Sequence, residues 1–274
     1  MISDGSTKNF QQCMDLPEEG AYSLTLRQNK ILLFSNYSRD CYQLVDGKWK
    51  IHSTLNQSRG QSSSAVTTNY GTFIFGGDGS KYTYEFLPNE SSEWQLGKPE
   101  IPRGFRGGCA IALKSKPEIW LIGGYYTNRR ILSFDLQTHA FTILPTKLLV
   151  DRSSFQCSYI PNTNKIIVTG GGGCDLSSTE IIDTVDGSVT MASPMRNRRH
   201  DHGIGIVTVN DVDRVAVFGG YGDIGGIDSR GGYLKSVDIF NPESGKWEDS
   251  KFELKEGKAN CGFVSVSNKL IMPN

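Results

Sequence analysis

The segment RRHDHG places two histidines and an aspartate close together. His200 and His202 are two residues apart, so an extended backbone directs both imidazoles to the same side of the chain. A zinc site needs a third or fourth ligand, and no nearby histidine or cysteine has the required spacing. A polar loop with titratable side chains is the better interpretation, and we expect no metal and no cofactor.

A glycine-rich segment at 220–225, GYGDIG, matches the G-x-G-x-x-G spacing of dinucleotide-binding loops. Such loops open a helix whose N-terminus receives the pyrophosphate, whereas here further glycines and a strand-like run follow. A long loop is therefore favoured. Cys174 has no basic neighbour to lower its thiol pKa, and no G-x-S-x-G segment is present, so we assign no catalytic residue.

Arginines at similar places before apolar runs are the sharper signal for binding. They are Arg59, Arg103, Arg152 and Arg199. Their planar guanidinium groups bind carboxylates in a bidentate manner, which favours an acidic partner. The other candidate partner-contacting residues are Arg106, His200, His202, Tyr125, Tyr126 and Tyr221. The alternative is that the arginines cap strands or brace neighbouring units through backbone carbonyls.

The elements that position these residues are repeated along the chain. Four apolar runs end in a glycine pair: TFIFGG, IWLIGG, IIVTGG and VAVFGG. An earlier run, ILLFSN, has the same form without the glycines. After each pair come a second strand-like run, a polar turn and an aromatic residue, and before each pair lies a further strand. The pattern of each unit therefore predicts four short strands. No stretch of the sequence shows sustained helical periodicity.

This pattern resembles the Kelch repeat, and the resemblance covers nearly the whole chain. It implies an all-β, six-bladed Kelch-type β-propeller, a ring of radial four-stranded sheets. Glycine fits where backbones crowd or turn with positive φ, and tryptophan supplies apolar area between blades. The expected structural residues are Gly76, Gly77, Gly123, Gly124, Gly170, Gly171, Gly219, Gly220, Trp49, Trp94 and Trp247.

We expect a single domain over residues 1–274. Its units are 18–55, 56–99, 100–147, 148–194, 195–252, and 253–274 together with 1–17. The N-terminus would supply the outer strand of the last blade, which would otherwise leave an open edge. A third strand for that blade is missing from the pattern, so either this blade is incomplete or the chain is a piece of something longer.

Composition narrows the function. The chain has 29 basic and 29 acidic side chains in 274 residues, which disfavours nucleic acid as a partner. No segment approaches the roughly 20 apolar residues that span a bilayer, and none reads as a signal peptide. We expect a cytoplasmic protein with reduced, mostly buried cysteines. Three N-x-S sequons, at Asn36, Asn56 and Asn89, leave a secreted protein as the alternative.

The resemblance implies a non-enzymatic module that binds a protein or an acidic peptide on its loops. Similar domains recognise substrates in adaptors of ubiquitin ligases or associate with actin, although this chain has no BTB or BACK region. In a propeller, the loops that carry the arginines and those that carry the glycine pairs emerge at the same end. The alternative is a sugar-type small-molecule binder or an isomerase-like enzyme that uses the central pocket at that end. The oligomeric state is left open.

Overall fold

The computed structural model describes residues 22–35, 38–125, 129–172, 177–223, 231–260 and 262. Within these ranges every regular element is a β-strand. No helix in this part of the chain could span a membrane. The strands form five four-stranded sheets and one three-stranded sheet. The expected all-β class is therefore confirmed.

The first sheet contains β1 (Tyr22–Arg27), β2 (Lys30–Ser35), β3 (Asp40–Val45) and β4 (Lys48–Thr54). The second contains β5 (Ser64–Thr68), β6 (Gly71–Phe75), β7 (Tyr84–Pro88) and β8 (Gln95–Leu96). The third contains β9 (Cys109–Ala112), β10 (Glu118–Ile122), β11 (Arg130–Asp135) and β12 (Phe141–Lys147). The fourth contains β13 (Gln156–Tyr159), β14 (Lys165–Thr169), β15 (Thr179–Asp183) and β16 (Val189–Ala192). The fifth contains β18 (Gly203–Val209), β19 (Val212–Phe218), β22 (Ser236–Asn241) and β23 (Lys246–Glu253). A separate small sheet consists of β17 (Arg199–His200), β20 (Tyr221–Asp223) and β21 (Gly231–Tyr233).

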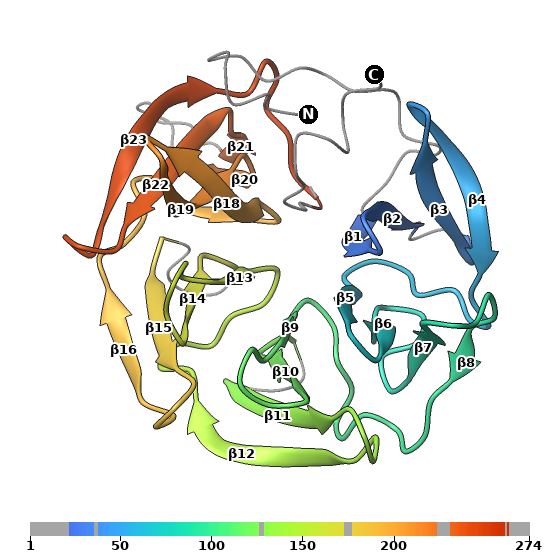
Figure 1. The fold of residues 1–274 in the computed structure, drawn as a ribbon. Coiled ribbons are helices and arrows are strands. Elements are labelled where there is room, and N and C mark those ends of the chain that lie inside the picture. The colour runs from blue at the N-terminus through green and yellow to red at the C-terminus, as the bar shows by residue number, and fades with distance from the viewer. Residues whose placement is uncertain are drawn as a thin grey trace.

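The five large sheets stand around a common centre, as Figure 1 shows. In each of them the strands pair antiparallel in chain order, with the first strand nearest the centre and the last at the rim. Successive inner strands contact one another, β1 with β5, β5 with β9, β9 with β13 and β13 with β18. This radial arrangement confirms the propeller architecture.

The sixth predicted unit lies mostly outside the described residues. The first four large sheets fall within the predicted units 18–55, 56–99, 100–147 and 148–194, and the fifth ends at Glu253. The blade number, the unit boundaries and the closing strand from the N-terminus therefore remain predictions.

The hydrophobic cores lie between consecutive sheets. Trp94 belongs to the core between the first and second sheets, and Trp247 to the core between the fourth and fifth. Each indole N–H donates to the preceding sheet, from Trp94 to Ser53 at 2.8 Å and from Trp247 to Thr179 at 3.1 Å. Trp49 on β4 is half-buried. Burying a large aromatic side chain stabilises such a seam by roughly 2–3 kcal/mol.

The glycine pairs end the second strand of a sheet where the next sheet comes close. Gly76 has a φ of 61° and Gly77 a φ of 104°. A Cβ atom on Gly76 would lie 1.8 Å from the carbonyl oxygen of Phe105, which belongs to the next connection. The Gly77 N–H donates to that same carbonyl at 3.0 Å. The other predicted pairs also have positive φ: Gly123, Gly124, Gly170, Gly171, Gly219 and Gly220.

The inner strands are joined across their seams by polar or covalent contacts. The Ser64 hydroxyl accepts the Ala110 N–H at 3.0 Å between the second and third sheets. Cys109 and Cys157 occupy the corresponding places at the next seam and form a disulfide. The expectation that the cysteines are reduced is therefore wrong for this pair. Cys41 is free and buried, and burial raises its pKa to about 12.

Candidate functional site

Two kinds of connection meet at one end of the molecule, which we call the loop face. They are the connections between the second and third strands of a sheet and those that lead to the next sheet. Hydrogen bonds join them, for example from the Gly124 N–H to the Arg152 carbonyl at 3.1 Å. A further series of backbone hydrogen bonds runs from sheet to sheet. The N–H groups of Gly107, Ser154 and Asp201 donate to the carbonyls of Ser62, Gly107 and Ser154, respectively, at 2.7–2.9 Å.

The loop-face arginine of the fourth sheet is buried in an ion pair. Arg152 contacts the Glu180 carboxylate through Nη2 at 2.7 Å and through Nε at 3.1 Å. Its Nη1 donates to the Gly170 and Ser178 carbonyls. Glu180 also accepts the Leu149 N–H at 2.6 Å. The guanidinium thus connects one end of the sheet to both loops that emerge there.

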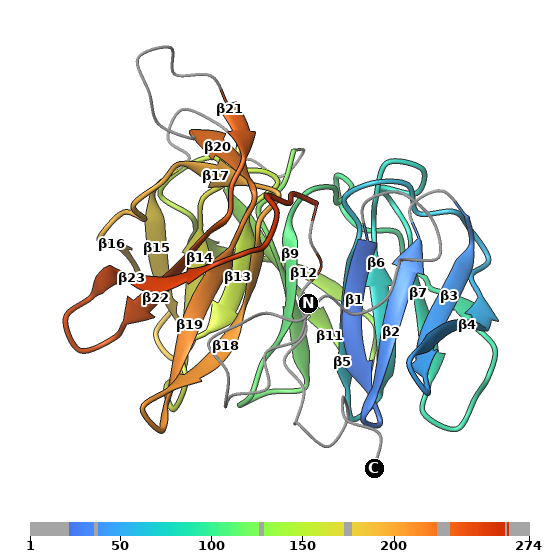
Figure 2. The ribbon, with the colours of Figure 1, turned by 90° about the horizontal axis from the view of Figure 1, so that it is seen from above.

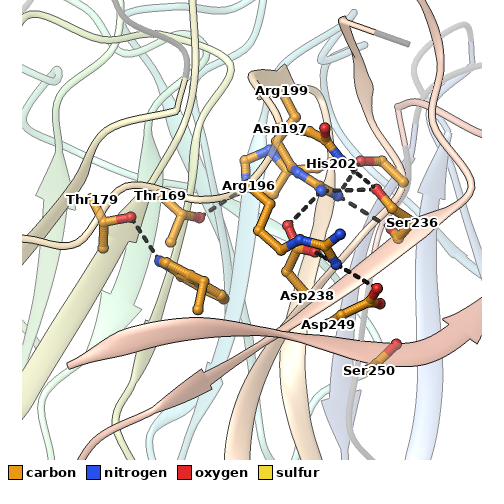
Figure 3. Close-up of polar contacts among 12 residues, drawn as sticks. Thr169, Thr179, Arg196, Asn197, Arg199, His202, Ser236, Asp238, Asp249 and Ser250 are labelled. Atoms are coloured by element: carbon orange, nitrogen blue, oxygen red, sulfur yellow. Dashed lines mark hydrogen bonds and ion pairs between the residues drawn. The ribbon is translucent and has the colours of Figure 1, made fainter. Parts of the chain in front are cut away.

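Arg59 and Arg199 repeat this arrangement in the second and fifth sheets. Arg59 pairs with Glu85 at 2.5 Å, and Arg199 pairs with Asp238 at 2.8 Å, as Figure 3 shows for Arg199. Burial lowers the pKa of both guanidiniums, while the paired carboxylates oppose that shift. Burial raises the pKa of Asp238, against the effect of Arg199.

These contacts correct the predicted binding residues. Arg59 and Arg199 have no exposed surface, and Arg152 is 4% exposed. A partner at the loop face cannot reach them, so the bracing alternative applies to these three arginines. His202 is also fully buried and accepts or donates one hydrogen bond with Thr169 at 2.8 Å.

The third sheet replaces the ion pair with apolar side chains. Strand register places Leu132 opposite Leu121, just as Glu85 lies opposite Ile74 and Glu180 opposite Val168. The Gly77 N–H donates to the Phe105 carbonyl, just as the Gly124 N–H donates to the Arg152 carbonyl. Phe105 therefore occupies, before the third sheet, the position that Arg152 occupies before the fourth. The fourth predicted arginine, Arg103, is thus not the counterpart of the others.

Arg103 is exposed on the loop face and forms no ion pair with a described residue. Arg106, nearby in the same connection, pairs with Asp78 across the seam. Its guanidinium carbon lies 4.6 Å from the ring centre of Tyr125, which is half exposed. Tyr82 is also exposed, and its ring lies beside Gly104 of the same connection. Arg103, Arg106, Tyr82 and Tyr125 therefore form one polar and aromatic group between the second and third sheets. Tyr126 lies outside the described residues.

A second group lies on the small sheet, which Figure 2 shows beyond the ends of β18 and β19. The His200 ring lies 5.5 Å from the Tyr221 ring, which lies 5.6 Å from the ring of Tyr233. His200 Nδ1 is 2.7 Å from the Asp201 carboxylate. Both tyrosines are exposed.

The two histidines of RRHDHG have different surroundings and do not face a shared site. His200 is partly exposed beside Asp201, while His202 is enclosed beside Thr169. Burial, together with the nearby cations Arg199 and Arg152, holds the pKa of His202 well below its ordinary value. His202 is therefore a neutral internal residue at physiological pH.

A polar cleft of about 250 Å³ opens beside the small sheet, between the fourth and fifth sheets. It is lined by Ser177, Met195, Arg196, Asn197, Arg198 and Asp223. Arg196 pairs with Asp249 at 2.7 Å, as Figure 3 shows. Arg198 is exposed and has no ion pair with a described residue.

Sequence reasoning missed three exposed residues of the loop face, namely Tyr82, Arg198 and Tyr233. It also missed the acidic partners of the buried arginines. A signal for the latter was present, because Glu85, Glu180 and Asp238 each interrupt an apolar strand-like run. A charged residue inside such a run is rarely buried unless it is paired.

Comparisons with known proteins agree with the repeat pattern. Residues 224–250 match the Kelch motif. The chain is 24% identical over 260 residues to a RING finger domain and kelch repeat-containing protein of Dictyostelium discoideum, a match that covers 92% of this chain. It spans about a quarter of that relative's length, 25%. The solved structure of YjhT is similar with a TM-score of 0.71 at 16% identity, over 89% of this chain and 88% of that one.

The comparison with YjhT corrects the prediction that this protein is not an enzyme. YjhT has the Kelch fold and is an enzyme, so the fold does not support that exclusion. At 16% identity the likeness shows the fold alone.

Proposed function

Because the chain is a β-propeller in which residues 224–250 match the Kelch motif, we propose that it is a protein-interaction module whose loop face binds an acidic protein or peptide. The observation that carries this proposal is the distribution of charge on that face. Three arginines are neutralised inside the molecule, whereas Arg103 and Arg198 stay exposed without a described acidic partner. Exposed arginines beside tyrosines are typical of binding surfaces.

A role in substrate recognition is the finer part of the proposal. The Dictyostelium relative combines a RING finger domain with kelch repeats in one protein. By analogy, the loop face of this chain would select the protein that a ubiquitin ligase modifies. The whole relative is much longer than the matched part, so this role rests on that analogy.

Charge reversal tests the binding face. We expect the double variant Arg103→Glu/Arg198→Glu to weaken binding of a synthetic aspartate- and glutamate-rich peptide about tenfold or more, measured by fluorescence anisotropy. The matched control is Lys48→Glu/Lys116→Glu, which changes the net charge equally at turns of the opposite end. Equal affinities in both variants would show that the loop face does not bind the peptide.

The sugar-type alternative makes a different prediction. A small molecule that binds only the folded protein raises its Tm by mass action. Thermal unfolding with a panel of monosaccharides, alongside the acidic peptide, separates the two. A rise in Tm with a sugar and none with the peptide would contradict the proposed function.

A further inference from the structure

We propose that the small sheet and the adjoining cleft form one composite recognition site for an extended peptide that carries a carboxylate next to an aromatic or proline ring. This inference rests on the proposed function and specifies which part of the loop face reads the partner. The carboxylate would meet Arg198, and the ring would lie on the tyrosines of the small sheet.

The small sheet is additional to the propeller. The fifth sheet is complete as β18, β19, β22 and β23. Of the small sheet, β20 and β21 lie in the fifth sheet's connection from Gly219 to Lys235, and β17 lies in the connection that leads to β18. The second sheet makes the corresponding connection between Gly76 and Thr83. The strand-paired part of this connection, β20 with β21, is not needed to complete any large sheet and is a surface available for recognition.

Its aromatic residues are held in place by close backbone contacts. A Cβ atom on Gly231 would lie 2.5 Å from the Tyr221 ring, so that ring rests on bare backbone. A Cβ atom on Gly222 would lie 1.8 Å from the Arg198 carbonyl oxygen, so β20 lies directly against the connection that carries Arg198. Tyr233 is 63% exposed and meets Tyr221 edge to face. Rigid, exposed tyrosines supply contact area at a low entropic cost.

The cleft supplies the positive charge that would bind the carboxylate of the peptide. Asp223 on β20 and Arg198 beside β17 both line it, so the cleft and the small sheet share their boundary. Arg196 is already balanced by Asp249, which leaves Arg198 as the cation without a described acidic partner. A volume of about 250 Å³ accommodates one carboxylate side chain, and a free guanidinium binds such a group through paired hydrogen bonds.

The test uses the full chain and peptides selected on it from a random displayed library. We expect the selected peptides to share an acidic residue near an aromatic residue or proline. Tyr233→Ala and Arg198→Gln should each weaken their binding about tenfold, and Tyr233→Phe should retain it. For comparison, Tyr82→Ala and Arg103→Gln remove the same residue types from the group between the second and third sheets and report whether the peptide uses that group instead. The controls expected to leave binding unchanged are Tyr70→Ala and Lys116→Gln, at turns of the opposite end. Thermal unfolding checks that each variant is folded.

The outcomes separate this inference from the broader proposal. If binding falls with Arg103→Gln and Tyr82→Ala but not with Arg198→Gln and Tyr233→Ala, the loop face still binds peptides and the composite site is overturned. Selected peptides without a carboxylate, or retained binding when it is replaced by an amide, also overturn it. If no peptide binds the loop face, both the inference and the proposed function fail.

Discussion

At the scale of single residues, the identity of a side chain did not decide its role. Arg103 and Arg152 both precede an apolar run, yet one is exposed and the other is enclosed with Glu180. Taking a guanidinium out of water is costly unless a carboxylate and further acceptors replace the lost hydration. The position of Arg152 is occupied in the third sheet by Phe105. The strand after the glycine pair differs to match, with Glu180 beside Arg152 and Leu132 at the same register position of the third sheet.

We expect Arg152→Met to lower the free energy of unfolding by about 3–5 kcal/mol, because it leaves Glu180 buried without its cation. Adding Glu180→Leu should recover part of the loss, since it approaches the apolar pair of the third sheet. The recovery stays partial because the Leu149 N–H loses its acceptor. Chemical denaturation of the single and double variants measures this coupling.

The exposed arginine provides the control. Arg103→Met should change stability by no more than about 0.5 kcal/mol, as surface substitutions usually do. If Arg152→Met were as stable as the wild type but no longer bound the acidic peptide, Arg152 would belong to the binding surface and not to a structural ion pair.

At the scale of elements, the seams between sheets carry both the packing and the cross-links. The seam between the second and third sheets joins Ser64 to Ala110 by a hydrogen bond. The next seam joins Cys109 to Cys157 by a disulfide that spans 48 residues of sequence. Equivalent positions on the inner strands therefore join neighbouring sheets in both seams, by a hydrogen bond in one and by a disulfide in the other.

The double variant Cys109→Ser/Cys157→Ala converts the disulfide seam into a copy of its neighbour. We expect it to fold and to be less stable than the oxidised protein by about 2–4 kcal/mol, because the cross-link no longer restricts the unfolded chain. Denaturation with and without a dithiol reductant provides the measurement. The reductant should destabilise the wild type and leave the variant unchanged; a wild type indifferent to reductant would contradict the cross-link.

At the scale of the whole molecule, burial shifts the pKa of three histidines in the same direction. Burial is the main cause that lowers the pKa of His52, His139 and His202 in the folded protein. Between the folded and unfolded pKa values, the unfolded chain binds more protons than the folded one. Stability contributed by these groups is therefore present above the ordinary pKa near 6.5 and is lost as the pH falls below it.

We expect the free energy of unfolding to decrease as the pH is lowered through about 6.5, where the histidines of the unfolded chain take up protons before those of the folded protein. Urea denaturation at a series of pH values measures the slope. His202→Gln, which cannot be protonated, should flatten the slope relative to the wild type. An unchanged slope in that variant would show that His202 does not contribute to the pH dependence.

The sequence alone determined the repeated strands, the glycine pairs and the tryptophans, because these depend on local conformation and on a period that recurs along the chain. ILLFSN lacks the glycines, and its residues 31–35 still lie in β2, since the apolar run itself specifies a buried strand. Only the tertiary structure decided which arginines are internal, because each depends on an acid brought opposite it by strand pairing. The disulfide and the aromatic group of the small sheet were likewise settled by contacts between residues far apart in the chain, which no local pattern records.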